Sequence, residues 1–580
     1  MCIRDRHLDG TLRSIEERER CITLAWRLPI AAEGGTWWND IGTPKTIEPG
    51  GTYRNAAPIG GYGPFSVYPF SSVVTADAST ALSLAVPMDP PRPFRIGYDA
   101  AEGLTIEWDL ALSSLPEQFP RSADFHAVIY RHDPAWGFRS AAERYYALFP
   151  TSFEVRVPKF GNWYYADLSE LPNPEGFGLA YNEFIQPGSA DSDHAQGNIV
   201  FGYTEPWGWW GWALGLKPAE DDPQPSYEEM LATLQRVAGE EELLAKPGQN
   251  RAKVAQTIIN SGMQDRDGRY IFMQRYVARW GGLNWVLNPS PWAVEEGLLS
   301  RFSGTYEWEV ERKLGWGADG IYLDSITKNW CGVGNYREEH LRRSRHPLTF
   351  SALDAEPVQI GLTADYEFTQ HISEDLHARG KLLMANIFPN LWVFFNHKLD
   401  VMGHEVWGAE NLDLMRAERT LAYHKPYCWL MQQGEAYGKP EDREKWMRAA
   451  MLYGIMPNVV GGAKDPATWE RWRPLYRTYM PTIIALAEAG WEPVTLAKTE
   501  TEGVLVERFG GGDGPLYLTA RNEGSEAVEA AIEVDWAALE CAAPASVKRL
   551  PAGDAVALTD GRIVDAIRPG ETCAYELIAP

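Results

Sequence analysis

The sequence predicts a multidomain protein in which a central (β/α)8 TIM barrel is flanked by N-terminal and C-terminal antiparallel β-sandwiches. Two observations carry this prediction. The 580 residues are too many for a single hydrophobic core. Residues 158–492 alternate short apolar runs with helical patterns, whereas the flanking segments contain short runs separated by turn residues. We therefore expect sandwiches at 1–135 and 493–580, a linker helix within 136–157 and the barrel at 158–492.

The N-terminal sandwich is predicted from apolar or alternating runs that Gly and Pro residues separate. These runs span residues 21–28, 66–69, 81–86, 94–98, 104–110 and 125–131. A helical pattern follows at 136–148. The first six residues resemble a translated sequencing adapter, so we expect 1–6 to be artefactual and the natural N-terminus, with any export signal, to be missing. The compartment is then unknown.

Eight candidate strands predict the barrel, since eight parallel strands close a (β/α)8 fold. They span residues 160–166, 198–205, 283–288, 320–325, 381–387, 400–407, 427–432 and 456–461. Helical patterns precede the fourth, fifth, seventh and eighth of these strands. After residue 493 the helical patterns stop, and five short runs predict the second sandwich. These runs span residues 504–509, 516–521, 528–534, 546–550 and 573–578.

Composition restricts the possible partners. The formal net charge of −25 argues against nucleic acid, because binding phosphate needs a basic surface. No segment holds eighteen uninterrupted apolar residues, so we expect no membrane span. The 24 Trp and 26 Tyr residues suit stacking on sugars, although aromatic side chains also fill protein cores. Oligomeric state is not predicted.

The barrel strand with the clearest sequence signals has a carboxylate at its end. Residues 317–326 read GADGIYLDSI, a short β-branched and aromatic run that follows two glycines. In period-two alternation Tyr322 and Asp324 face one side, while Ile321 and Leu323 face the other. An acid at the C-terminal end of a barrel strand is a catalytic candidate, and the structural alternative is a capping Asp at a strand–loop junction.

The other strand ends carry amide, carboxylate and aromatic side chains, which suit a neutral ligand rich in hydroxyl groups. The predicted substrate-binding residues are Trp163, Glu205, Trp207, Asn288, Tyr322, Asn386, Trp407 and Gln432. Four Trp residues at 207, 209, 210 and 212 are dense enough for one or two to form a stacking platform. No His or Cys residues occur at metal-ligand spacing, so we expect neither a metal nor another cofactor.

A sugar ligand beside Asp324 suggests hydrolysis of a glycosidic bond, which needs one ionised and one protonated carboxyl group. We expect Asp324 to be the ionised group. Glu405, at the end of the sixth strand, is the expected acid, because Val406 and Trp407 could desolvate it and raise its pKa. The strand parity leaves open whether Glu405 faces the barrel interior or the helices. The other candidates for the acid, in order, are Glu205, Asp365 and Glu410.

This layout resembles the retaining glycoside hydrolases that combine an N-terminal β-sandwich, a (β/α)8 barrel and a C-terminal β-sandwich. The α-glucosidase, α-galactosidase and endo-α-N-acetylgalactosaminidase-like families share it, and residues 317–325 look like their nucleophile strand. The resemblance implies Asp324 as nucleophile, an acid at the sixth strand, where this chain has Glu405, and an α-linked oligosaccharide or glycoconjugate as substrate. Two alternatives stay open: a non-catalytic carbohydrate-binding protein on a degenerate barrel, and a barrel lyase or metal-dependent hydrolase.

Overall fold

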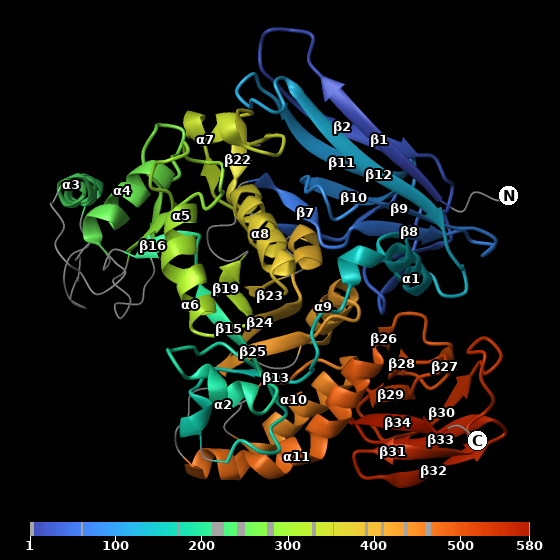
Figure 1. The fold of residues 1–580 in the computed structure, drawn as a ribbon. Helices are drawn as coiled ribbons and strands as arrows, with labels where there is room; N and C mark the ends of the chain where they lie inside the picture. The colour runs from blue at the N-terminus through green and yellow to red at the C-terminus, as the bar shows by residue number, and fades with distance from the viewer. Residues whose placement is uncertain are drawn as a thin grey trace.

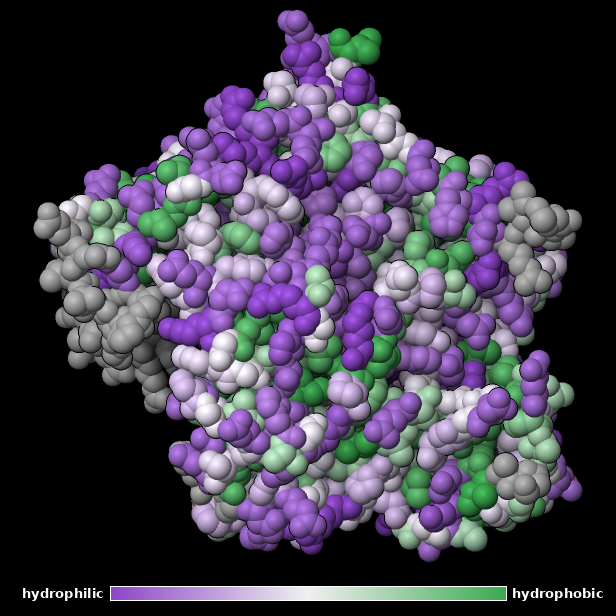
Figure 2. Space-filling model, in the orientation of Figure 1, coloured by the Kyte–Doolittle hydropathy of each residue, from purple (hydrophilic) through white to green (hydrophobic). Residues whose placement is uncertain are grey.

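A computed structural model describes most of the chain and shows β-sheet domains on two sides of a central parallel sheet that helices cover (Figure 1). The described residues are 5–59, 62–171, 173–210, 226–239, 250–274, 283–326, 332–351, 353–388, 393–407, 411–433, 439–458 and 466–578. The face in Figure 2 is mostly hydrophilic, with hydrophobic residues scattered over it. None of the helices in these ranges has the length and apolar character needed to cross a bilayer.

Two antiparallel sheets pack face to face in the N-terminal region, as the alternating runs predict. The larger sheet has the order β1 (Asp5–Arg13), β12 (Ser122–Arg131), β9 (Ala81–Ala85), β8 (Phe70–Val74), β3 (Thr36–Trp38) and β4 (Pro44–Thr46). The smaller has the order β2 (Arg20–Leu28), β11 (Gly103–Leu112), β10 (Phe94–Asp99) and β5 (Thr52–Arg54). A short hairpin joins β6 (Ala56–Pro58) to β7 (Pro64–Ser66). Ile106, Trp108 and Val128 belong to a buried core that continues into the barrel.

The described residues of the barrel form a parallel sheet of seven strands. Its order is β13 (Asn162–Tyr164), β14 (Leu179–Asn182), β15 (Ile199–Thr204), β19 (Gly320–Ile326), β23 (Leu382–Ile387), β24 (Val401–Trp407) and β25 (Tyr427–Gln433). Cys428 of β25 makes a parallel bridge to Met456. The Asn458 amide donates to Oδ1 of Asn162 on β13 at 3.1 Å, so the sheet is nearly closed.

One predicted barrel strand is wrong, and another went unpredicted. The run at 283–288 contributes β18 (Leu283–Val286), which pairs antiparallel with β16 (Gly208–Trp210) and β17 (Phe272–Gln274) outside the barrel. The second barrel strand is β14, which is only four residues long and follows a glycine-rich stretch. Periodicity cannot tell a parallel strand from an antiparallel one, which explains the error. The predicted eighth strand is seen as the bridge at Met456, and residues 459–461 lie outside the described ranges.

Helices pack on the outer face of the parallel sheet and between it and the C-terminal sheet (Figure 1). The helices are α1 (Phe138–Leu148), α2 (Ala190–His194), α3 (Tyr227–Ala238), α4 (Arg251–Ser261), α5 (Arg301–Thr305), the π-helical turn η6 (Tyr306–Val310), α6 (Glu311–Gly315), α7 (Glu338–Arg343), α8 (Gly361–Ala378), α9 (Leu412–Ala422), α10 (Pro440–Tyr453) and α11 (Pro466–Ala489). Short 3-10 turns lie at η2 (Pro150–Phe153), η3 (Leu168–Glu170) and η7 (Val393–Lys398).

Two long excursions leave the carboxyl ends of barrel strands. The first follows β15 and carries β16, β17, β18, α3 and α4 around its own buried core, which includes Trp209 and Trp285. The second follows β19 and carries α7 with the small sheet of β20 (Gly334–Asn335), β22 (Pro357–Ile360) and β21 (Thr349–Phe350). Because carboxyl ends of barrel strands carry the functional residues of this fold, both excursions lie where a substrate site is expected.

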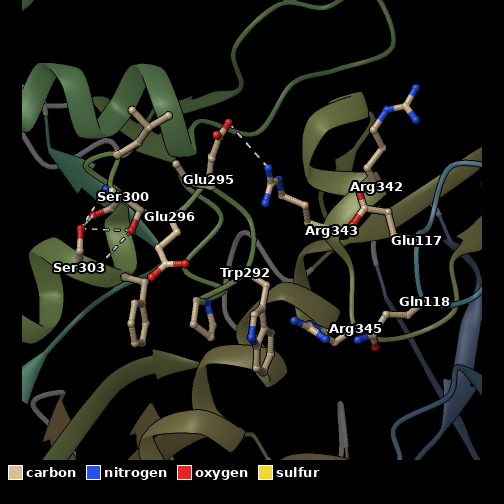
Figure 3. Close-up of a pocket in the computed structure, with 15 residues that line it drawn as sticks. Glu117, Gln118, Trp292, Glu295, Glu296, Ser300, Ser303, Arg342, Arg343 and Arg345 are labelled. Carbon is tan, nitrogen blue, oxygen red and sulfur yellow. Dashed lines mark hydrogen bonds and ion pairs between the residues drawn. The ribbon is translucent and has the colours of Figure 1, made fainter.

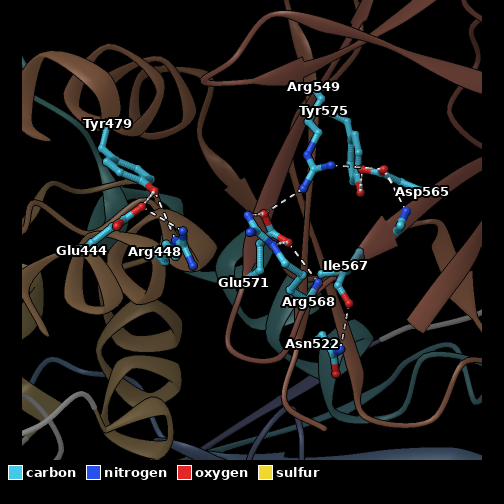
Figure 4. Close-up of polar contacts among 11 residues, drawn as sticks. Glu444, Arg448, Tyr479, Asn522, Arg549, Asp565, Ile567, Arg568, Glu571 and Tyr575 are labelled. Carbon is cyan, nitrogen blue, oxygen red and sulfur yellow. Dashed lines mark hydrogen bonds and ion pairs between the residues drawn. The ribbon is translucent and has the colours of Figure 1, made fainter. Parts of the chain in front are cut away.

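The C-terminal region is a nine-stranded antiparallel sheet with its own core. Its order is β26 (Trp491–Glu492), β28 (Val504–Gly510), β29 (Leu516–Asn522), β34 (Thr572–Ile578), β31 (Ser546–Leu550), β32 (Asp554–Thr559), β33 (Arg562–Ile567), β30 (Val528–Val534) and β27 (Ala497–Thr499). Arg549 joins neighbouring elements by ion pairs to Glu571 at 2.9 Å and Asp565 at 3.3 Å (Figure 4). In the adjoining helices, Tyr479 of α11 donates to Glu444 of α10 at 2.8 Å.

A buried ion pair ties the N-terminal part of the chain to the C-terminal sheet. Arg139 of α1 donates to both carboxylate oxygens of Glu507 on β28, at 2.7 and 2.9 Å. The indole of Trp491 donates to the same carboxylate at 2.9 Å, and the Glu507 side chain is only 2% exposed. This bidentate contact joins segments that are far apart in sequence.

Candidate active site

Asp324 lies at the carboxyl end of β19, in the middle of the parallel sheet. A Cβ atom added at Gly202 would contact Lys313 of α6 and Ile321, so Ile321 faces the helices and Asp324 faces the barrel interior. Asp324 is partly exposed, whereas its neighbours Leu323 and Ser325 are buried. Ser325 has a φ of +62°, and the pairing of β19 with β23 shifts register between Leu323 and Ile326. Such an irregularity at a strand end re-aims a side chain.

Donors from both neighbouring strands hold the Asp324 carboxylate. Asn386 of β23 donates to Oδ1 at 2.8 Å, and the hydroxyl of Tyr203 on β15 lies 3.0 Å from Oδ2. Ser325 Oγ donates to Oδ2 at 2.9 Å. The indole of Trp207 donates to the backbone carbonyl of Asp324 at 2.6 Å. Hydrogen bonds to a carboxylate are charge-assisted, so Asp324 is held in one orientation while remaining accessible.

Glu205 shares the Tyr203 hydroxyl with Asp324. The hydroxyl oxygen lies 3.4 Å from Glu205 Oε2, and because it carries one hydrogen it donates to one carboxylate at a time. Buried Arg301 fixes the backbone of this turn by donating to the carbonyls of Glu205 at 2.7 Å and Pro206 at 3.0 Å. Glu205 therefore lies beside Asp324 at the end of the adjacent strand.

Glu183 is a rim carboxylate that sequence reasoning missed. It directly follows β14, and the indole of Trp163 on β13 donates to its Oε2 at 3.1 Å. Burial, together with the negative charges of Asp324 and Glu405, raises the pKa of Glu183 well above its usual value of 4.5. Burial therefore favours the protonated form of Glu183. The signal that could have found it is the short run 179–182, which ends in Asn182 and is followed by Glu183, in the same way as a barrel strand end.

The raised pKa of Glu183 predicts a specific effect on stability. Above about pH 4.5 the unfolded chain releases this proton while the folded chain keeps it, so folding loses stability as the pH rises. Glu183→Gln removes that loss, and we expect its melting temperature to exceed that of the wild type by a margin that grows as the pH rises above about 4.5. Calorimetry across this range measures it, with Glu307→Gln, at an exposed helical position, as the control. A constant margin would contradict the assignment.

The contacts of β24 settle which way Glu405 points. Nδ1 of His404 lies 2.6 Å from Glu418 Oε1 on α9, and Trp429 of β25 donates to the same carboxylate at 3.0 Å. His404 and Trp429 are paired across the two strands and both face the helices. Alternation then turns Glu405 toward the barrel interior. The charge of Glu405 also contributes to raising the pKa values of Glu183 and Tyr322, so these three groups lie close together. We call this region, at the carboxyl ends of the barrel strands around Asp324, the mouth.

Three further predicted residues lie around this mouth. Trp163 holds Glu183, and Asn386 holds Asp324. The Tyr322 hydroxyl lies 3.4 Å from Asp324 Oδ1, and burial with the charges of Glu183 and Asp324 raises the pKa of Tyr322. Of the residues described, no three His, Cys, Asp or Glu side chains are grouped to hold a metal ion.

Two predicted binding residues are enclosed by protein and do not line the mouth. Trp207 is 0% exposed and packs its ring against Phe368 of α8 at 5.9 Å. Asn288 is 1% exposed and donates to Gln359 at 3.0 Å. Both stabilise the excursions, because their polar groups are already bonded within the protein.

Of the Trp residues from which a stacking platform was predicted, Trp209 is also enclosed by protein. Trp209 packs against Trp308, with ring centroids 5.6 Å apart, and the Arg301 guanidinium lies 4.4 Å from its ring. It therefore belongs to the core of the first excursion. Asp365 is buried in α8, and this burial raises its pKa well above 3.8. The side chains of Trp210, Trp212, Trp407, Glu410 and Gln432 lie outside the described residues.

Comparisons with known proteins identify the fold. No family model and no curated protein sequence matches the chain. The galactosidase domain of the α-galactosidase–sucrose kinase AgaSK superposes with a TM-score of 0.55 and 8% identity, over 99% of this chain and 78% of that one. The chain shares its fold with glycoside hydrolases.

Two further solved structures that match are similar over most of their length. The α-N-acetylgalactosaminidase NagBb from Bifidobacterium bifidum has a TM-score of 0.44 and 13% identity, over 86% of this chain and 82% of that one. A β-arabinopyranosidase has a TM-score of 0.44 and 10% identity, over 99% of this chain and 83% of that one.

Proposed function

We propose that the protein is a glycoside hydrolase that cleaves an α-linked glycosidic bond in an oligosaccharide or glycoconjugate. The observation that carries this proposal is the accessible Asp324 carboxylate, held by donors from β15 and β23 in a mouth that also contains Glu183, Glu205 and Glu405. Glycosidic hydrolysis needs an ionised and a protonated carboxyl group, and this mouth offers candidates for both roles. The shared fold with the AgaSK galactosidase domain supports the reaction class.

The proposed mechanism retains the configuration at the anomeric carbon. Asp324 attacks that carbon while Glu405 gives its proton to the departing glycosidic oxygen, which forms a glycosyl-enzyme and releases the first product. Glu405, now ionised, takes a proton from water, and the water oxygen displaces Asp324 from the sugar. Asn386 and Tyr203 hold Asp324 in place for the attack. Glu183, whose pKa burial raises in the same mouth, is the second candidate for the acid.

A screen of hydrolysis tests the proposed function. The purified protein should release nitrophenol from at least one nitrophenyl α-glycoside, or cleave a bond in α-linked oligosaccharides that chromatography resolves. Proton NMR of the first product formed should show the α-anomer before mutarotation. Absence of hydrolysis across both anomeric series and the oligosaccharides would refute the function, and an inverted first product would refute the retaining mechanism alone.

A further inference from the structure

A second cavity lies outside the mouth, between the N-terminal sandwich and the excursions (Figure 3). Its volume is about 490 Å³, and its wall includes Glu117 of the sandwich, Trp292 and Glu296 of the first excursion, and Arg343 and Arg345 of the second. A pocket of this size at a junction between domains is a common place for a small ligand to bind.

Packed aromatic rings separate this cavity from Asp324. Phe302 lines the cavity, and its ring centroid lies 6.2 Å from that of Phe368 on α8. Phe368 packs on Trp207, whose indole donates to the Asp324 carbonyl. The cavity is therefore on the other side of the wall that supports Asp324, and it is not an extension of the mouth.

The wall of the cavity carries charged side chains of both signs, and their capacity for hydrogen bonds and ion pairs is only partly used. The ion pair between Arg343 and Glu295 is long, at 3.8 Å. In the described part of the chain, neither Glu117 nor Glu296 forms an ion pair, and Arg345 is near enough to the buried Glu367 for its charge to act on that carboxyl. The Arg345 guanidinium lies 5.1 Å from the centre of the Trp292 ring. Figure 3 shows Glu296 and Arg345 on opposite sides of Trp292, so acceptors and donors flank an aromatic ring.

We propose that this cavity is a carbohydrate-binding site, separate from the catalytic mouth, that takes a neutral glycan segment. A sugar presents an apolar C–H surface to Trp292, donates hydroxyl hydrogens to Glu296 and accepts hydrogen bonds from Arg345. Carboxylates and guanidiniums on the same wall disfavour a strongly anionic or cationic ligand, because either would meet like charge. The site goes beyond the proposed hydrolysis, since it would recruit a glycan without reacting with it.

Electrophoresis in native gels tests the proposal. The probes are soluble starch, galactomannan and desialylated mucin as neutral glycans, with polygalacturonate as the anionic one. At least one neutral glycan should retard the wild-type protein. Trp292→Ala should weaken that binding by roughly five- to tenfold, since stacking contributes about 1 kcal/mol. Glu296→Ala, at an exposed position, should also weaken it and does not disturb the core.

Trp316→Ala is the matched control, because Trp316 is also half-exposed and has the Arg312 guanidinium 5.1 Å from its ring, but it does not line the cavity. It should bind like the wild type, and melting temperatures should show that all variants fold. Hydrolysis of a nitrophenyl glycoside should be unchanged in each variant, although the binding test does not depend on hydrolysis. No retardation by any neutral glycan, equal retardation of Trp292→Ala and Trp316→Ala, or retardation by polygalacturonate alone would each overturn the proposal.

Discussion

Asp324→Asn should lower kcat/KM on the order of 10⁴-fold or more while the protein stays folded. Asn keeps the shape of the side chain but cannot form the glycosyl-enzyme, so the loss falls on the chemical step. Asn386 can still donate to the amide oxygen in the position of Oδ1, and Ser325 Oγ can accept from the amide nitrogen in the position of Oδ2. Steady-state kinetics on the substrate found in the screen measure the effect, and thermal denaturation reports the fold.

Asp319→Asn is the control for Asp324→Asn. Asp319 directly precedes β19 at its amino end, where its carboxylate lies 2.9 Å from His194 and accepts from the Val200 amide at 3.0 Å. This variant changes the contact with His194 but should keep its turnover within a few-fold, because Asp319 lies at the opposite end of the same strand from Asp324. Azide added to Asp324→Ala should restore product formation as a glycosyl azide of inverted configuration. Activity of Asp324→Asn close to the wild-type value would refute the nucleophile assignment.

Glu405→Gln should show a loss of activity that depends on the leaving group. Without an acid, departure of an alkoxide or sugar oxygen becomes difficult, and general acid catalysis contributes roughly 10² to 10⁴-fold. A dinitrophenyl leaving group needs little protonation, so its glycoside should be cleaved nearly as fast as by the wild type in the first step. Kinetics on a series of aryl glycosides of decreasing leaving-group acidity measure this dependence.

Glu183→Gln is the matched comparison, because Glu183 is a second Glu of the same mouth and carries a raised pKa. If Glu405 is the acid, Glu183→Gln should slow all leaving groups by a similar factor. A steep leaving-group dependence in Glu183→Gln, with a flat one in Glu405→Gln, would transfer the acid role to Glu183. The two profiles therefore decide which carboxyl group protonates the glycosidic oxygen.

The strand of Asp324 could be predicted because its signals are local. Two glycines punctuate its start, alternation runs through Ile321 to Leu323, and the acid follows directly. The antiparallel sheets on either side could be predicted for the same reason, since short alternating runs with turn residues recur along both segments. The neighbours that hold Asp324 come from β15 and β23, so its environment depends on pairing between distant segments.

The missed parts of the site depend on tertiary contacts. β14 has four residues, which are too few for an alternating pattern to be recognised. Because this strand was not predicted, Glu183, which directly follows it, was not predicted as a site residue either. The orientation of Glu405 depends on His404 meeting Glu418 of α9, a contact that strand parity alone could not reveal. Trp207 is a residue type that suits stacking on a sugar, but it is buried against Phe368 of α8 and its indole is bonded to the Asp324 carbonyl. Burial of an aromatic side chain is a property of the fold and not of its local sequence.

The ion pair between Arg139 and Glu507 means that the C-terminal sheet is not a detachable appendage. A shortened chain that ended after the barrel would leave Arg139 without its carboxylate and would uncover the faces of α10 and α11 that contact the sheet. Accessory domains that are joined only by a tether can be lost or exchanged between proteins at little cost to their neighbours. Here the three regions are expected to unfold together as one cooperative unit.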